Sequence, residues 1–364
     1  SEAADNNNKA LIDKLAAEFS DELANLGVRV ADLEAKTDNV KWEGLIRYDW
    51  KSNNFAANDG HKKTEDGNNT VKLRFEPSMV INENWTGHAR IDYDVNKDNT
   101  AADNGAEVQK IYAEGQYSKF NVKLGRFGTF SDASHGLVMD DQVTGAEFTY
   151  APTEAWKVKA TAGRTDVVNK DLAYGTKMKV DPNTKHNNDT DAATYWAVEA
   201  NYAQGKWDAG LGYHNVGATH TMQKKGESNS SYHIIDLGVG YAFDKNVKLT
   251  GDYAWGPSQN VVENAANNAY SIELDYKGAD AADPGSWGAY VAYRQLAPFA
   301  TISYTYDFGA GDYGVASLKG WEIGTSYTFA KNIVATAKYF NGKDTAESKD
   351  DKATGVFTRV DFLF

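Results

Sequence analysis

The chain of 364 residues contains no cysteine, only six prolines and no long apolar run. The absence of cysteine excludes disulfides, thiolate zinc sites and cysteine nucleophiles together. No stretch approaches the roughly 18 to 20 consecutive apolar residues that a membrane-spanning helix needs. The formal net charge of −13 argues against a nucleic acid as the partner. If the chain crosses a membrane, it must therefore do so with strands, whose side chains face lipid only at every second position.

Motifs of enzyme active sites are also scarce. Residues 309–314 match the dinucleotide-binding pattern G-x-G-x-x-G, but no helical pattern follows, as that function requires. The seven histidines include no H-E-x-x-H motif, and G-x-S-x-G does not occur. We therefore expect neither catalysis nor a cofactor, although a hydrolase site assembled from distant residues would leave no motif. Calcium is an alternative for the acidic loops, but a solvated loop is the simpler interpretation. The aspartates concerned are Asp98, Asp103, Asp189 and Asp191.

What the sequence does contain, from Lys41 to its end, is alternation. Apolar and aromatic residues at 42, 44, 46, 48 and 50 alternate with mostly polar ones, and the same period of two returns in later segments. These segments include 71–76, 85–94, 207–213, 247–255 and 321–329. Runs of about ten residues with aromatic ends match strands that cross a bilayer at a tilt, whereas soluble strands average five or six residues. A secreted β-sandwich is the alternative that composition alone leaves open.

The connections favour the barrel over the sandwich. Short turns such as 81–84 and 330–332 alternate with long polar loops such as 52–69 and 165–192, as in outer-membrane barrels. About seventeen runs alternate. An odd number of strands conflicts with a barrel whose two chain termini lie on the same side of the membrane. We therefore assign 297–317 to an external loop with at most a local strand. The prediction is an all-β fold: a transmembrane antiparallel β-barrel of about 16 strands over residues 41–364, with a water-filled lumen, in the bacterial outer membrane.

Residues 1–40 follow a different period. Apolar residues recur at spacings of three and four, which is the heptad seam of a coiled coil, and charged residues occupy the other faces. The seam consists of Ile12, Ala16, Phe19, Leu23, Leu26, Val30, Leu33 and Val40, with Thr37 at the position between the last two. We predict an N-terminal α-helical coiled-coil stalk in the periplasm, and hence an oligomer. The alternative is one amphipathic helix packed on its own domain.

The end of the chain carries a second signal. Val360, Phe362 and Phe364 share one face of an alternating run, and the last residue is aromatic. Soluble proteins seldom end inside a strand, because termini fray unless they are tied down. This ending resembles the signal read by the outer-membrane barrel assembly machinery, which we expect as a partner.

Several segments resemble one family. Residues 22–34 and 41–44 look like the linker between an S-layer homology domain and a porin barrel in the OmpM-type porins of diderm Firmicutes (Negativicutes). Related porins occur in cyanobacteria and the Thermus–Deinococcus group, and residues 320–324, 330–332 and Phe364 fit the same pattern. The resemblance covers essentially the whole chain from about residue 11.

The resemblance implies a homotrimer in outer-membrane lipid and lipopolysaccharide, with a trimeric stalk. It implies a general-diffusion porin that passes ions and small hydrophilic solutes. It also implies a tether to peptidoglycan through an S-layer homology domain, which is not among these residues and would be encoded upstream of Ser1. The alternative function is chiefly a structural anchor between outer membrane and cell wall, with incidental or no conduction.

A channel needs a polar wall and usually a constriction. Arg47, Arg74 and Arg90 lie on the polar faces of three successive strands, and Asp92 shares those faces. In general porins the loop after the fifth strand folds into the lumen, and here that loop carries several polar residues. They are Asp132, His135, Asp140 and Asp141. We expect these acids to face the arginines, with Arg126 as a further candidate, and so to set a transverse field. The alternatives are an external or periplasmic loop and scattered, solvated lumen charges.

Overall fold

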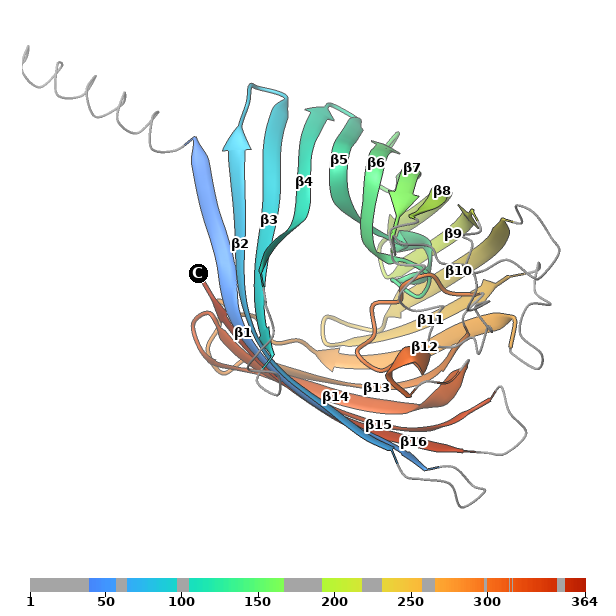
Figure 1. Cartoon of the computed structure of the whole chain (residues 1–364). Coiled ribbons are helices and arrows are strands. Elements are labelled where there is room, and N and C mark those ends of the chain that lie inside the picture. Colours follow the sequence, from blue (N-terminus) through green and yellow to red (C-terminus); the bar gives the residue numbers. More distant parts are fainter. Residues whose placement is uncertain are drawn as a thin grey trace, which may run out of the picture.

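The computed structural model describes residues 39–56, 64–96, 105–166, 192–217, 231–256, 266–297, 300–313, 315, 317–345 and 351–364. Within them the chain forms sixteen antiparallel strands, each paired with the next, and β1 pairs with β16 to close the barrel (Figure 1). The strands are β1 Val40–Ala56, β2 Thr64–Val80, β3 Trp85–Asn96, β4 Ala106–Tyr117, β5 Phe120–Phe130, β6 Asp140–Tyr150, β7 Trp156–Thr165, β8 Ala193–Gln204, β9 Trp207–Val216, β10 Tyr232–Ala242, β11 Val247–Trp255, β12 Asn268–Lys277, β13 Trp287–Leu296, β14 Leu318–Ala330, β15 Ile333–Asp344 and β16 Lys352–Leu363. The predicted barrel of about 16 strands is confirmed.

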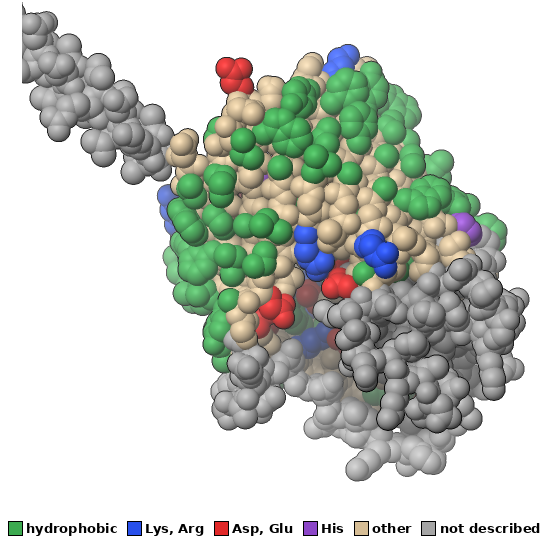
Figure 2. Space-filling model, turned by 45° about the horizontal axis from the view of Figure 1, so that its top comes forward, with side chains coloured by type: hydrophobic (Ala, Val, Ile, Leu, Met, Phe, Trp, Pro, Cys, Tyr) green, Lys and Arg blue, Asp and Glu red, His purple; other side chains and the backbone are tan. Residues whose placement is uncertain are grey.

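The two faces of the sheet follow the alternation of the sequence. In β1, Trp42, Ile46 and Trp50 are exposed on the outer face. Between them, Arg47 and Asp49 point into the lumen, where Arg47 lies opposite Asp361. Apolar side chains cover much of the outer surface, with few charges among them (Figure 2). This arrangement suits a barrel with lipid outside and water inside.

The barrel closes at the last residue of the chain. The backbone N–H of Phe364 donates to the carbonyl of Gly44, and the N–H of Gly44 donates to that of Phe364, both at 3.0 Å. A Cβ on Gly44 would lie 2.7 Å from the Phe364 ring, so only glycine leaves room for the ring beside β1. The ring makes an edge contact with Phe75 at 6.0 Å between centroids. The predicted assembly residues, Phe362 and Phe364 among them, thus lie on the outer face next to the closing seam.

Within its described residues, the connection between β13 and β14 forms no crossing strand, as predicted, but it is not external. It folds back inside the ring of strands and includes the short 3-10 helix η3 (Ala310–Tyr313) (Figure 1). Ala300, Ile302 and Phe308 are all buried there. The run alternates as a strand does because Ala300, Ile302, Tyr304 and Tyr306 pack in one apolar cluster, whereas Ser303 and Asp307 between and beyond them make polar contacts.

The predicted stalk lies almost wholly outside the described residues, which begin at residue 39. The described part of the seam is Val40, and here the prediction is wrong, because Val40 is the first residue of β1 and pairs with Met79. No helix among the described residues is long and apolar enough to cross a membrane.

Candidate functional site

Two connections at the same end of the barrel fold into its lumen. We call the β5–β6 connection, residues 131–139, L3, and the β13–β14 connection, residues 297–317, L7. L3 begins with the 3-10 helix η1 (Asp132–Ser134), which lies against β8, β9 and β10. The N–H of Ala133 donates to Glu199 at 3.1 Å, and the hydroxyl of Ser134 donates to Asp236 at 2.5 Å. Side chains of the barrel wall thus hold L3 by its backbone and by its side chains.

Asp132 fixes the start of L3 to β7. Its carboxylate lies 2.9 Å from the ammonium of Lys159 and 3.0 Å from that of Lys157. Burial raises the pKa of Asp132, but the two lysines outweigh burial and bring its pKa below the ordinary value. Asp132 is therefore ionised when L3 is held against β7.

His135 fixes the tip of L3 to two further strands. Its Nδ1 lies 2.7 Å from Asp252 and its Nε2 lies 2.6 Å from Asp208. A neutral imidazole has one N–H, so both nitrogens donate to carboxylates only when the ring is protonated. Burial lowers the pKa of His135, but the hydrogen bonds and charges of Asp252 and Asp208 outweigh burial and raise it. The sharp turn requires φ of 47° at His135 and 84° at Gly136, a conformation that favours glycine.

L7 is joined to L3 by backbone hydrogen bonds. The N–H groups of Ile302 and Ser303 donate to the carbonyl of Val138 at 2.8 and 3.0 Å, and the N–H of Thr305 donates to Gly136 at 3.0 Å. Met139 and Ser303 form a parallel β-bridge. The two loops therefore behave as one layer inside the barrel.

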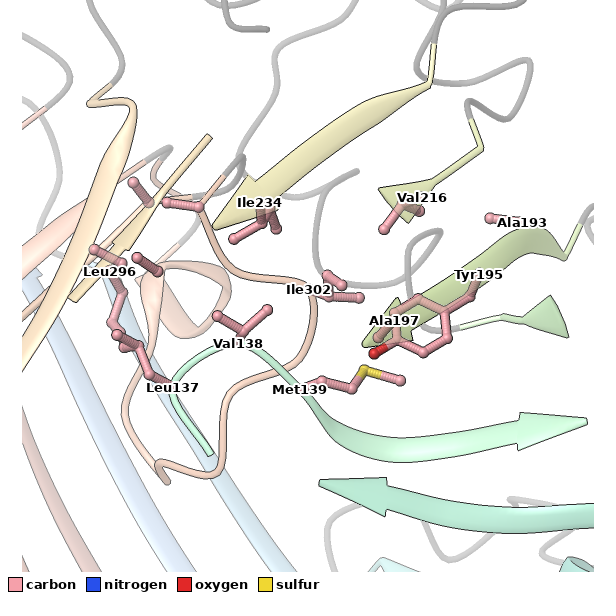
Figure 3. Close-up of a cluster of buried hydrophobic side chains, with 14 of the residues drawn as sticks. Leu137, Val138, Met139, Ala193, Tyr195, Ala197, Val216, Ile234, Leu296 and Ile302 are labelled. Carbon is pink, nitrogen blue, oxygen red and sulfur yellow. The ribbon is translucent and has the colours of Figure 1, made fainter. Parts of the chain in front are cut away.

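An apolar core lies between this layer and the barrel wall (Figure 3). Val138, Met139 and Ile302 from the loops meet Tyr195 and Ile234 from β8 and β10. Removing this surface from water favours the docked loops. One side of the lumen is thus filled by protein.

The second half of L7 crosses to the opposite side of the barrel. Asp307 accepts from Lys338 at 2.6 Å, and its carbonyl accepts from Lys51 at 2.5 Å. Arg359 lies 3.8 Å from the same carboxylate. Burial raises the pKa of Asp307, but Lys338, Arg359 and Lys51 outweigh burial and lower it. Phe308 stacks on Phe340 at 5.6 Å.

Between these two attachments L7 rests on a buried arginine. The ring of Tyr306 lies over the guanidinium of Arg294 at 4.0 Å, and Arg294 forms ion pairs with Glu322, at 2.9 Å, and with Glu273. Burial raises the pKa of Tyr306 to about 12 despite the nearby cation. Gly309, part of the G-x-G-x-x-G match, has a packing role, because a Cβ there would collide with the hydroxyl of Tyr304.

The three predicted wall arginines point into the lumen, and each forms an ion pair with a carboxylate. Arg47 lies 2.6 Å from Asp361, and Arg74 forms two hydrogen bonds, of 2.7 and 2.6 Å, with Asp92. Arg90 lies 2.6 Å from Glu76. Opposite charges in direct register stabilise neighbouring strands.

The other predicted residues lie elsewhere. Asp141 lies in the lumen-facing register of β6 and accepts a hydrogen bond from Ser303 at 3.2 Å. Asp140, the preceding residue, is exposed and lies in the outward-facing register. Arg126 is in the outward register with Leu124, donates to the carbonyl of Gln109 at 3.1 Å and lies 3.5 Å from Asp166.

The acids of L3 therefore do not pair with the wall arginines. L3 bends toward β7–β11, where lysines and carboxylates hold it, and away from the first three strands. Sequence reasoning missed Lys159, Asp208, Asp252 and the inward course of L7. The aspartates considered for calcium lie outside the described residues.

Comparisons with known proteins agree with this architecture. A family described as "Putative porin" matches residues 230–351. No curated protein sequence matches the chain. Among solved structures, OprB of Pseudomonas putida is similar with a TM-score of 0.59 at 12% identity, covering 89% of this chain and 94% of OprB. DcaP of Acinetobacter baumannii, an outer membrane channel, has a TM-score of 0.57 at 13% identity, covering 89% and 97%. OmpF of Salmonella typhi has a TM-score of 0.56 at 14% identity, again covering 89% and 97%. The chain therefore has the fold of outer-membrane porins.

Proposed function

We propose that the protein is a diffusion channel of the bacterial outer membrane, passing ions and small hydrophilic solutes down their gradients, and that it has no catalytic role. The observation that carries this proposal is a closed barrel of sixteen strands whose lumen is lined with charged side chains. A barrel of this size leaves an aqueous channel unless it is filled.

The path for solutes runs between the L3–L7 layer and the wall formed by β2 to β5. Side chains under the layer are withdrawn from water: Glu199 is 2% exposed and Asp236 is 0% exposed. On the other wall, Arg74, Arg90 and Lys110 remain partly exposed. Solutes in this path would meet side chains whose charges are mostly paired. The channel should therefore select solutes mainly by size and only weakly by the sign of their charge.

Conductance of the purified protein in a planar lipid bilayer tests the proposal. We expect stepwise insertions that close in thirds, because we propose a homotrimer of open barrels. A silent bilayer, from protein shown to be folded by heat-modifiable migration on a gel, would contradict the channel and favour the anchor described below.

The wall arginines should influence ion selectivity. Arg90→Gln removes one lumen cation while leaving Glu76 in place, so we expect the reversal potential in a salt gradient to shift toward cation preference. Arg126→Gln makes the same charge change on the outward register and serves as the control. Equal shifts in both variants would show that the solute path does not follow the wall that carries Arg90.

We further propose that the full-length protein ties the outer membrane to peptidoglycan through an S-layer homology domain upstream of the 1–40 stalk. The resemblance of residues 22–34 and 41–44 to the linker of porins that carry such a domain supports this proposal. Binding of the full-length protein to isolated peptidoglycan, compared with the 364-residue chain, tests the tether. Equal binding by both would rule out the upstream domain as the tether.

A further inference from the structure

A β-bulge in β4 places Lys110 on the lumen wall. Lys110 pairs with Arg90 on β3. The next pair along the two strands is Val108 with Ile91, so Gln109 is an extra residue on β4. Without the bulge, regular pairing from that end would put Gln109 opposite Arg90 and would turn Lys110 to the outer face. Bulges re-aim side chains in this way and are frequent next to functional sites.

Lys110 differs from the neighbouring cations of the same wall. Each of those cations is bound to a carboxylate, whereas among the described residues no hydrogen bond or ion pair reaches the ammonium of Lys110. Its side chain is partly exposed, so the ammonium is accessible to a solute. The bound cations are Lys72 and Arg74 with Asp92, Arg90 with Glu76, and Lys123 with Glu147, at distances from 2.6 to 3.1 Å.

More distant charges leave the ammonium of Lys110 uncancelled. Arg90 and Arg74 repel it, and Glu76 and Asp140 attract it without contact. Glu76 already lies 2.6 Å from Arg90, so most of its charge is offset there. Asp140 is exposed to water, which screens its charge. The fields of the paired cations thus largely cancel at short range, whereas the field of Lys110 reaches the lumen.

Gly128 on β5 provides the space that the ammonium takes. A Cβ on Gly128 would lie 2.7 Å from Nζ of Lys110, so a side chain there would displace the ammonium. Gly128 lies near the end of β5, which leads directly into L3. The ammonium therefore stands where the wall formed by β2 to β5 meets the L3–L7 layer, beside the path proposed for solutes.

We propose that Lys110 sets the sign of the ion selectivity and makes the channel prefer small anions. This inference rests on the diffusion channel proposed above and names the class of solute that the channel favours. The charges that line a pore determine which ions enter it, and a charge without a counter-charge acts over the longest range. A unit charge about 6 Å from an ion in water changes the local concentration of that ion about three-fold.

Reversal potentials in a gradient of potassium chloride test the proposal. Lys110→Gln should lower the permeability ratio of chloride to potassium about three-fold, and Lys110→Arg should keep the ratio of the unchanged protein. The matched control is the double variant Glu76→Gln with Arg90→Gln, which removes a whole ion pair from the same wall without changing the net charge. Lys119→Gln makes the same charge change as Lys110→Gln at the exposed short turn between β4 and β5. Both controls should keep the ratio. An unchanged ratio in Lys110→Gln, or an equal fall in the double variant, would overturn the proposal.

A second measurement needs no current and so separates Lys110 from the channel itself. Because the chain has no cysteine, Gln109→Cys adds a single thiol beside Lys110. The rate of labelling by an anionic methanethiosulfonate, divided by the rate with a cationic one, should fall about three-fold when Lys110→Gln is added. The ratio cancels any change in the reactivity of the thiol.

The two measurements together distinguish the possible failures. A silent bilayer combined with a fall in the labelling ratio would contradict the channel but support Lys110 as the group that attracts anions into the lumen. A labelling ratio that does not change would overturn the role of Lys110, whether or not the protein conducts. Heat-modifiable migration confirms that each variant is folded.

Discussion

Replacing Asp307 by asparagine is expected to release L7 from β1, β15 and β16 and to raise both the mean conductance and its noise. The carboxylate of Asp307 faces the cations of Lys338 and Arg359, and its backbone carbonyl accepts from Lys51. Removing one member of this partly buried ion group costs less than the roughly 3 kcal/mol of a fully buried pair, about 1 to 2 kcal/mol, because water screens the remaining charges in part. That corresponds to a factor on the order of 10 in the ratio of docked to released loop.

Single-channel recording of Asp307→Asn measures this effect directly. Asp361→Asn is the matched control, because Asp361 also faces the lumen and pairs with a cation, Arg47, but has its partner on the barrel wall. We expect the control to keep the conductance and noise of the unchanged protein. Identical traces from Asp307→Asn and the unchanged protein would show that L7 does not narrow the channel.

Raising the pH is expected to loosen the tip of L3. The pKa of His135 is raised above its ordinary value of 6.5, so the protonated ring stabilises L3 in its position against β9 and β11. This contribution is fully present below the ordinary pKa and is lost as the pH rises through the raised pKa of the folded protein. Once the ring is neutral, only one nitrogen donates, and the lone pair of the other faces a carboxylate, Asp208 or Asp252.

Other charges near the ring set the size of this effect. Lys248 lies 2.8 Å from Asp208 and keeps that carboxylate partly neutralised after His135 loses its proton. Current noise recorded from mildly acidic to alkaline pH should therefore increase through a single titration. His135→Gln should abolish the pH dependence, whereas His88→Gln, a change at another lumen histidine, should preserve it. A titration that persists in His135→Gln would place the responsible group elsewhere.

The alternation of the sequence was sufficient to predict the barrel, because the two faces of each strand have different surroundings: the outer face is apolar, and the inner face meets water or the inner loops. It was less informative at the ends of the strands. The segment expected as a loop at 52–69 instead continues β1 to Ala56 and starts β2 at Thr64. Polar residues there no longer alternate with apolar ones, so the period of two disappears although the backbone pairing continues.

The partners of the inner loops could not be predicted from the sequence. His135 contacts Asp252, which is 117 positions away, and no local pattern indicates which wall the loop will approach. The inward course of L7 could not be predicted for a different reason. Its run from Ala300 to Phe308 alternates as a strand does, but it packs on L3 and on the lumen wall and not across a membrane.

The closing seam also limits the time at which the barrel can form. Arg47 and Asp361 are 314 positions apart, and the closing hydrogen bonds of Gly44 are made by the final residue. Contacts between distant parts of a chain form slowly, because the entropy of a large loop must be lost first. Until β16 pairs with β1, the sheet has two unpaired edges, which invite pairing with other chains. The edge of β1 therefore stays exposed until the last strand pairs with it, and a truncation that removes β16 would leave it exposed.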